Sequence, residues 1–224
     1  MDEGIGRREA LASAITGQGA RPYQAIKRIF DFVLGISFLL LALPFMVAVA
    51  LLIRIGSPGP AIIRQSRVGR GGLGFAMLKF RTMRQGADED LEDVLTRDPE
   101  LRLTWQQFQK LVHDPRLTPV GRWLRRHSVD ELPQLWNVVR GEMSLVGPRP
   151  FLPEQQPFYG PAIEEYAKAR PGMTGLWQVS GRNRLSFEER VKLDLQYLRQ
   201  RSLRLDLLIL LQTARAVIRA TGAF

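Results

Sequence analysis

The chain has 224 residues, of which 45% are hydrophobic and 24% are charged. This length and composition exclude a fully disordered chain and predict one domain, or one domain with an appendage. The sequence contains no cysteine, which excludes a disulfide framework, thiolate catalysis and cysteine-based zinc sites. The formal net charge of +10 predicts an anionic partner, such as nucleic acid, an acidic membrane surface or a phosphorylated substrate.

The N-terminal part joins a polar tail to a long apolar run. Residues 1–25 are mixed, contain glycine and show no periodicity, which predicts a mobile tail. From Phe32 to Ile53 the chain carries no charge, a stretch long enough for a membrane helix and long for the core of a signal peptide. Two basic residues lie three and four positions before Asp31, which allows an ion pair on one helix face.

The flanks of the apolar run indicate how it meets a membrane. Lys27 and Arg28 precede it and Arg54 follows it, and positively charged flanks prefer the cytoplasmic side. Pro44 lies near the middle of the run, where proline kinks or breaks a helix. The simplest interpretation is a helix–break–helix over residues 26–60 that enters one leaflet and returns. A Pro-kinked helix that spans the membrane is the alternative.

After the apolar run, the sequence predicts a β-hairpin. Ala61–Val68 and Phe75–Phe80 are the expected strands, and residues 69–74 form a glycine-rich turn between them. The turn contains the pattern G-x-G-x-x-G, but a dinucleotide site requires a helix to open on that pattern. A weakly alternating segment follows instead, so we exclude a Rossmann site.

The rest of the chain is predicted to be mainly helical. The acidic segment Asp88–Glu100 is typical of a solvated helix or loop. Leu101–Val112 and Phe187–Ala220 are predicted helices, and Thr118–Arg126 is a basic stretch.

The final predicted helix has one apolar face and one basic face. This pattern is typical of a helix lying on an anionic bilayer, and also of an ordinary surface helix packed on a core. Asp206 falls at the edge of the apolar stripe, where a carboxylate is unfavourable unless it is paired or functional. Asp206 is therefore a candidate site residue. The apolar stripe consists of Leu203, Leu207, Leu210, Ala214 and Val217.

The densest set of chemical groups surrounds the adjacent acids Asp130 and Glu131. Ser128 and Glu131 have the spacing of a capping box, but Pro133 shifts the predicted helix start toward Asp130. Either start places the acidic pair at a helix N-terminus, where anions are favoured. The same place suits a substrate phosphate if a divalent cation and arginines offset the two carboxylates, which suggests phosphoryl transfer. The candidate arginines are Arg81, Arg125, Arg126, Arg149 and Arg182.

Six segments in order then carry a family pattern: Lys79–Met83, Asp114–Arg116, Ser128–Asn137, Gly141–Pro150, Arg170–Arg182 and Gly222–Phe224. With these segments the sequence resembles the bacterial sugar transferases that initiate exopolysaccharide synthesis, the monotopic polyprenyl-phosphate phosphoglycosyl transferases. The resemblance runs from about Lys27 to Phe224 and is to the short, catalytic-core form of the family.

The resemblance implies a mechanism and a set of site residues. Asp130 is expected to attack the β-phosphate of a UDP-sugar, release UMP and carry the sugar phosphate until undecaprenyl phosphate accepts it. UDP-galactose or UDP-glucose is the expected donor. Glu131 is expected to activate the acceptor or organise the metal, with Mg²⁺ at Asp130. The expected substrate and phosphate contacts are Arg125, Arg149, Arg81, Arg182 and Asp206.

The resemblance also implies an α+β, mainly helical fold with a small β-hairpin and amphipathic interfacial helices. Residues 1–25 are the expected tail, 26–60 the re-entrant membrane hairpin, and 61–224 the catalytic domain on the cytoplasmic face of the bacterial inner membrane. In the family the membrane helix breaks at a Ser-Pro pair, whereas this chain has Leu43-Pro44. The serine hydroxyl that could satisfy freed backbone groups is therefore absent.

The sequence is also consistent with other functions. The same chemistry could use an N-acetylated or dideoxy UDP-sugar. A different class is a non-catalytic, membrane-tethered protein that binds anionic lipid or nucleic acid. That class gives no reason for an acidic pair among arginines, and the sequence shows no aromatic-rich nucleic-acid module. The expected partners are therefore a UDP-sugar, undecaprenyl phosphate and membrane lipid, without nucleic acid; a homodimer is a possible assembly.

Overall fold

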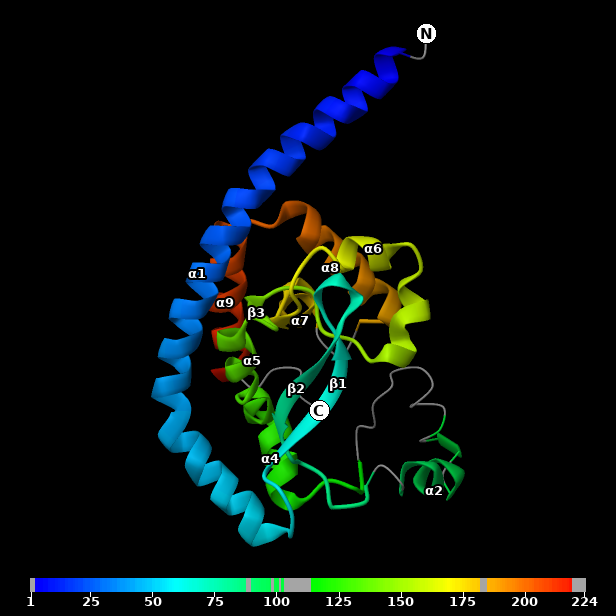
Figure 1. Ribbon diagram of the computed structural model, residues 1–224. Coiled ribbons are helices and arrows are strands. Elements are labelled where there is room, and N and C mark those ends of the chain that lie inside the picture. Colours follow the sequence, from blue (N-terminus) through cyan, green and yellow to red (C-terminus); the bar gives the residue numbers. More distant parts are fainter. Residues whose placement is uncertain are drawn as a thin grey trace.

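A computed structural model of the chain describes residues 3–87, 90–97, 99–100, 102, 114–181 and 185–218, with the backbone alone for residues 3–22, 90, 92–94 and 218. The described residues are mostly helical with a small antiparallel sheet, which confirms the predicted fold at this level (Figure 1). The predicted helix Leu101–Val112 lies outside the described residues except for Arg102.

The longest element is helix α1, which runs without interruption over Glu3–Gly56. It differs from the helix–break–helix expected within residues 26–60, because the helix continues through Pro44. A proline removes one backbone hydrogen bond and bends a helix, but packing on both sides can keep the helix intact. Figure 1 shows α1 curving around one side of the molecule. Residues 3–25, predicted to be a mobile tail, belong to the same helix.

One face of α1 packs against the rest of the protein between Lys27 and Ile53. Lys27 and Asp31 are buried before Pro44, and Val49 and Ile53 are buried after it. These residues follow the spacing of three or four positions that defines one helix face. The opposite face is apolar and exposed, with Leu41 81% and Ile55 83% accessible. Residues Tyr23–Gly56 are long and apolar enough to cross a membrane, with a mean hydropathy of 2.8.

The predicted hairpin is confirmed. Strands β1 (Ile62–Val68) and β2 (Gly74–Phe80) pair antiparallel, with Ile62 opposite Phe80 and Val68 opposite Gly74. The turn between them is a short 3-10 helix, η1 (Arg70–Gly72), in which Gly71 has a φ of 72°. Side chains at such a positive φ are disfavoured, which explains why glycine occupies this turn.

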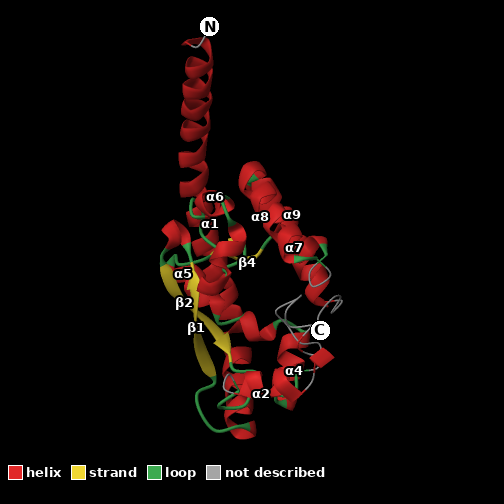
Figure 2. Ribbon diagram, turned by 90° about the vertical axis from the view of Figure 1, so that its right-hand side faces the viewer, coloured by secondary structure: helices red, strands yellow, loops and turns green. Residues whose placement is uncertain are grey.

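A second, parallel strand pair lies at the centre of the helical part. Strand β3 (Ser144–Val146) pairs with β4 (Gly172–Thr174). Figure 2 shows the β1–β2 hairpin and the α8–α9 helices on opposite sides of the body. The remaining elements are α2 (Asp90–Arg97), α4 (Pro119–Arg126), η2 (Val129–Glu131), α5 (Gln134–Arg140), η3 (Pro153–Tyr159), α6 (Ala162–Tyr166), α7 (Leu176–Ser180), α8 (Phe187–Gln200) and α9 (Leu203–Ile218).

Three apolar clusters hold these elements together. One cluster joins β2, α5, β3, α8 and α9 around Val138 and Ile209. A second packs α1 against the hairpin and α4 through Ile53, Phe80 and Leu124. The third lies under η3, α6 and α8. The hairpin and α4, which carry site residues, are thus fixed directly to α1.

Helix α9 differs from its predicted packing. The face that is buried contains Asp206 and Ile209, whereas Leu207 and Val217, both part of the predicted apolar stripe, are exposed. Only Leu203 and Leu210 of the stripe are partly buried, and Leu210 packs against the first apolar cluster. The burial of Asp206 is possible because polar partners from other elements reach it, which the sequence of one helix cannot show.

Candidate active site

A tight turn presents the two adjacent acids Asp130 and Glu131. Ser128 adopts the left-handed conformation, with a φ of 56°, and the short helix η2 follows it. The Ser128 side chain makes no capping hydrogen bond, so the capping-box interpretation is wrong. Helix α5 begins only after Pro133, because proline fits the first positions of a helix and not its interior.

Glu131 is held by two cations. Its Oε1 atom accepts hydrogen bonds from Arg149 Nη2 at 2.9 Å and from Lys79 Nζ at 3.1 Å. Burial alone would raise the pKa of Glu131, but Arg149 and Lys79 outweigh burial and hold the pKa well below its usual range. Glu131 is therefore an ionised, fixed carboxylate that orients both cations.

Asp130 has a different environment. Lys79 Nζ lies 3.9 Å from Asp130 Oδ2, and no side chain in the described part of the chain donates a hydrogen bond to this carboxylate. Burial raises the pKa of Asp130, Lys79 and Arg125 act in the opposite direction, and neighbouring Glu131 raises it further. Asp130 is therefore the member of the pair that is free to bond to a ligand.

Arg125 approaches Asp130 from the last turn of α4. Its Nε atom donates to Thr82 Oγ1 at 3.0 Å, which ties α4 to the segment after β2. Burial lowers the pKa of Arg125, and the Asp130 carboxylate partly offsets this effect. The close approach of α4 depends on Gly121, because a Cβ there would lie 1.8 Å from the Thr82 carbonyl oxygen.

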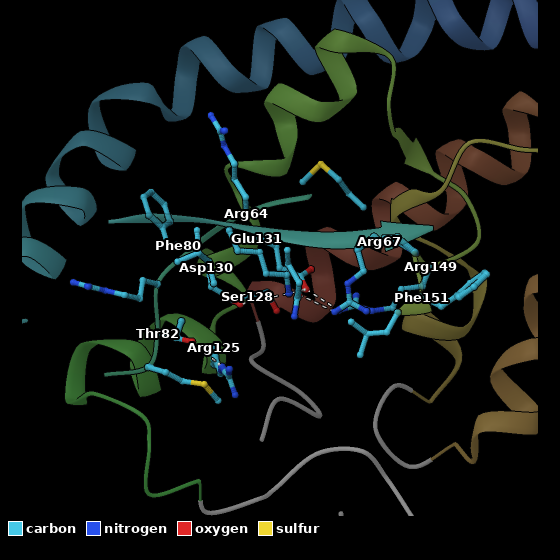
Figure 3. Close-up of a pocket in the computed structure, with 18 of the residues that line it drawn as sticks. Arg64, Arg67, Phe80, Thr82, Arg125, Ser128, Asp130, Glu131, Arg149 and Phe151 are labelled. Carbon is cyan, nitrogen blue, oxygen red and sulfur yellow. Dashed lines mark hydrogen bonds and ion pairs between the residues drawn. The ribbon is translucent and has the colours of Figure 1, made fainter. Parts of the chain in front are cut away.

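These residues line a single large cavity of about 1230 Å³. Figure 3 shows Asp130 and Glu131 beneath β1 and β2, with Arg125 on one side and Arg149 on the other. The guanidinium groups of Arg149 and Arg190 lie 5.7 and 4.9 Å from the ring centre of Trp177. A cavity of this size, with cations around two carboxylates, suits a large anionic ligand.

Comparison with known proteins gives the family. The family model described as "Bacterial sugar transferase" matches residues 22–220 of this chain. The chain belongs to the bacterial sugar transferase family.

Several curated relatives of this sugar transferase carry more specific names. The UDP-galactose-lipid carrier transferase of Erwinia amylovora is 47% identical over 199 residues, which cover 89% of this chain and 42% of that protein. The exopolysaccharide production protein ExoY of Rhizobium meliloti is 42% identical over 88% of both chains. The UDP-glucose:undecaprenyl-phosphate glucose-1-phosphate transferase of Caulobacter vibrioides is 41% identical over 88% of this chain and 72% of that protein. This chain thus spans less than half the length of some relatives and most of the length of others.

The sugar transferase brings four of the predicted site residues into one cavity: Asp130, Glu131, Arg125 and Arg149. Arg81 also lines the cavity, but its guanidinium donates to the carbonyl oxygens of Ser57, at 2.7 Å, and Pro58. These contacts fix Arg81 to the segment that follows α1. Arg182 and the segment Gly222–Phe224 lie outside the described residues.

Asp206 is placed away from Asp130, in a separate buried network. Its carboxylate contacts Tyr23, Lys27 and Tyr197. These partners come from α1 and α8, and the expected substrate contact of Asp206 stays a prediction. The predicted ion pair on α1 is confirmed, with Lys27 Nζ 2.7 Å from Asp31 Oδ1.

Sequence reasoning gave no role to several cavity residues. Lys79 belongs to a family segment, but its contact with Glu131 depends on where β2 passes η2. Arg67 of β1 also lines the cavity, and burial together with Arg149 lowers its pKa to about 10. Asp194 of α8 is buried, and burial raises its pKa well above the usual range. The available signals were the alternation of polar and apolar residues in β1 and β2 and, for Lys79, its place in a family segment.

Proposed function

We propose that this protein transfers a hexose-1-phosphate from a UDP-sugar to undecaprenyl phosphate and releases UMP. The reaction has two steps and passes through a phosphosugar ester of Asp130. The relatives whose names state a galactose or glucose transfer to undecaprenyl phosphate or a lipid carrier support galactose or glucose as the sugar. An N-acetylated or dideoxy donor is an outcome that the experiment below distinguishes.

The observation that carries this proposal is the difference between the two acids. Glu131 is held by two cations at 2.9 and 3.1 Å, whereas Asp130 receives no side-chain hydrogen bond within the described residues. A nucleophile must have a lone pair free to attack, and a second acid that fixes the surrounding cations can position the phosphate. The arrangement therefore supports attack by Asp130 and the positioning of Arg149 and Lys79 by Glu131.

In the first step, a carboxylate oxygen of Asp130 bonds to the β-phosphorus of the UDP-sugar. The bond from this phosphorus to the bridging oxygen breaks, and UMP leaves with that oxygen. Arg149, Lys79 and Arg125 surround the site and offset the charge on the phosphate oxygens. In the second step, a phosphate oxygen of the lipid attacks the same phosphorus and restores the Asp130 carboxylate.

The acidic pair offers only a small number of carboxylate ligands to Mg²⁺. No group of three or more His, Asp or Glu side chains with metal-ligand geometry occurs among the residues that the structure describes. Mg²⁺ commonly binds through one or two carboxylates together with substrate phosphates and water. Asp130 is the carboxylate of which neither oxygen atom accepts a side-chain hydrogen bond within the described residues, so it would hold the ion. A bound Mg²⁺ would neutralise charge on the diphosphate.

We also infer a monotopic position on the cytoplasmic face of the inner membrane. The face of α1 opposite the body is apolar and exposed, and Leu207 and Leu211 of α9 are exposed as well. An apolar surface of this kind, next to basic residues, favours the interface of an anionic bilayer. This position would let the cavity meet a soluble donor and the phosphate of a lipid acceptor.

The decisive experiment incubates purified protein with labelled UDP-sugars in the absence of lipid. We expect one sugar phosphate on Asp130, found by mass spectrometry, and one equivalent of UMP. Asp130→Asn should lose the adduct and reduce turnover by on the order of 10⁴-fold or more. Glu188→Gln, a change in an exposed ion pair with Lys192, is the matched control and should keep both. Turnover by wild-type protein without any adduct would contradict the two-step mechanism, and a panel of UDP-sugars identifies the donor.

A further inference from the structure

A buried polar network connects α1 to the strand that leads into the active site. Asp206 Oδ1 lies 2.7 Å from Tyr197 Oη, and Asp206 Oδ2 accepts from Tyr23 at 3.0 Å and lies 3.3 Å from Lys27 Nζ. Lys27 also donates to Asp31 at 2.7 Å, and Asp31 accepts from the Leu145 amide at 3.2 Å. The Asp206 side chain has no accessible surface, so these contacts must satisfy it without solvent.

Two hydroxyl groups of this network each lie between two acceptors. Ser144 Oγ is 2.7 Å from Asp31 Oδ2 and 2.8 Å from the Val146 carbonyl oxygen. Tyr197 Oη is 2.7 Å from Asp206 Oδ1 and 3.1 Å from the same Val146 oxygen. A hydroxyl has one proton to donate. If both carboxylates are ionised, two protons serve three acceptors, and one acceptor has no proton from either hydroxyl.

A proton on Asp206 completes the network. Asp206 can then donate to Tyr197, Tyr197 to the Val146 carbonyl, and Ser144 to Asp31, so each acceptor receives one proton. Asp31 is the less suitable place for that proton, because all of its contacts are donors and Lys27 lies closer to it than to Asp206. With Asp206 neutral, Lys27 and Asp31 also balance each other in charge.

We propose that Asp206 is a positioning residue, held as a neutral carboxylic acid that donates to Tyr197 and so fixes strand β3 ahead of Arg149. This inference rests on the proposed function, because it concerns the placement of a residue assigned to the donor phosphate.

The path from the network to Arg149 is short and rigid. Val146 is the last residue of β3, and Gly147 follows with its amide bonded to the Thr174 carbonyl at 2.9 Å. A Cβ on Gly147 would lie 2.6 Å from the Arg170 carbonyl oxygen, so the chain is tightly held there. Pro148 then restricts the backbone directly before Arg149. A displacement of Val146 would therefore move the guanidinium group of Arg149, which contacts Glu131.

The charged and titratable groups around Asp206 are consistent with a neutral acid. Helix α1 contributes Tyr23, Lys27 and Asp31, and α8 contributes Tyr197. Arg201 lies over the Tyr23 ring, 5.9 Å from its centre. Burial raises the pKa of Asp206, and Lys27 and the two tyrosine hydroxyls act against burial without reversing it. A hydrogen bond donated by Asp206 to Tyr197 is thus compatible with the groups around Asp206.

The first test measures the protonation state without any reaction. A folded-state pKa above the unfolded value means that stability is fully present below the unfolded pKa and decreases as the pH rises through the folded pKa. Asp206→Asn, which keeps an acceptor oxygen and a donor group, lacks this loss. We expect the unfolding equilibrium constant of wild type, relative to the variant, to grow by about tenfold per pH unit above about pH 4, until the folded pKa is reached.

An infrared difference spectrum reports the protonation state of Asp206 directly. The carbonyl stretch of a protonated carboxyl group should be present in wild type and absent in Asp206→Asn at neutral pH. A carboxylate band in its place, together with a pH-independent stability difference between the two proteins, would overturn the proposal. Glu188→Gln serves as the control for an acid-to-amide change at an exposed site.

The second test measures the effect on Arg149. Asp206→Asn should form the phosphosugar adduct within a few-fold of the wild-type rate, whereas Asp206→Ala should lose up to about 10²-fold in that rate. Because Asp206 acts through Arg149, the double variant with Arg149→Ala should lose no more than Arg149→Ala alone. Fully additive losses in folded variants would overturn the positioning role. Absence of an adduct in wild type would instead contradict the proposed function, and the pH and infrared measurements would still report on Asp206.

Discussion

At the scale of single residues, Asp130 and Glu131 show how neighbouring acids acquire different properties. Asp130 is buried and Glu131 is half-buried, but only Glu131 has two cations within hydrogen-bond distance. Those contacts lower the pKa of Glu131, whereas burial raises the pKa of Asp130. Environments that separate the pKa values of two acids commonly separate their roles in catalysis.

Lys79 is the residue whose removal tests this separation. Its ammonium group lowers the pKa of Asp130 against the effect of burial. In Lys79→Met the pKa of Asp130 should rise, so the ionised nucleophile is lost at a higher pH. We expect the acid limb of the pH–rate profile for adduct formation to move to higher pH, and the loss of activity to be greater in acid than in alkaline buffer.

The control for this prediction is Lys192→Met, which removes a lysine from an exposed ion pair with Glu188. It should leave the acid limb in place. A uniform loss of rate at all pH values in Lys79→Met would show that Lys79 holds Glu131 or the phosphate and does not lower the pKa of Asp130.

The sequence was sufficient to nominate Asp130, Glu131 and Arg149, because each lies in a recognisable family segment. Arg125 lies just before the segment Ser128–Asn137 and was nominated as a position that matches the family's active site. Asp206 was nominated as a carboxylate at the edge of an apolar stripe and as a match to a family site position, yet its placement depends on contacts that no local pattern contains. Its partner Tyr23 is separated from it by 183 residues. Such a contact exists only after α1, α8 and α9 have packed together.

At the scale of elements, the hairpin was predictable and the membrane helix was less so. Alternating residues and a glycine-rich turn are local signals, and β1 and β2 follow them closely. Proline is also a local signal, but its effect depends on packing. Contacts of α1 with the body before and after Pro44 accompany a continuous helix.

Helix α4 supplies a test of how one element positions a site residue. Gly121 faces the Thr82 backbone so closely that a Cβ would lie 1.8 Å from its carbonyl oxygen. Gly121→Ala should therefore push α4 away from Thr82, break the Arg125–Thr82 contact, and reduce stability by about 1–3 kcal/mol or more. Chemical denaturation measures the stability, and the yield of the phosphosugar adduct measures the site.

Gly56→Ala is the matched control, because nothing lies within 4 Å of a Cβ at that position. It should change stability little and leave the adduct intact. Equal effects of the two substitutions would mean that the contact between α4 and Thr82 has no special importance.

At the scale of the whole molecule, the two ends of the apolar part of α1 contact the same body. Before Pro44, Lys27 reaches Asp206 of α9. After it, Ile53 packs with Phe80 and Leu124. A helix that crossed a bilayer would place its ends on opposite sides, so both of these contacts favour a helix that stays on one side.

Cysteine labelling tests this topology, because the chain has no cysteine of its own. Gln24→Cys and Ser57→Cys place single thiols near the two ends of the apolar part of α1, and Lys168→Cys marks the exposed surface of the body. With a membrane-impermeant maleimide, all three should be labelled in inside-out vesicles and none in intact spheroplasts. Leu41→Cys, on the exposed apolar face, should be protected from both sides because lipid covers it. Labelling of Gln24→Cys in spheroplasts, with Ser57→Cys protected, would instead require α1 to span the membrane and its contact with Asp206 to be absent in the bilayer.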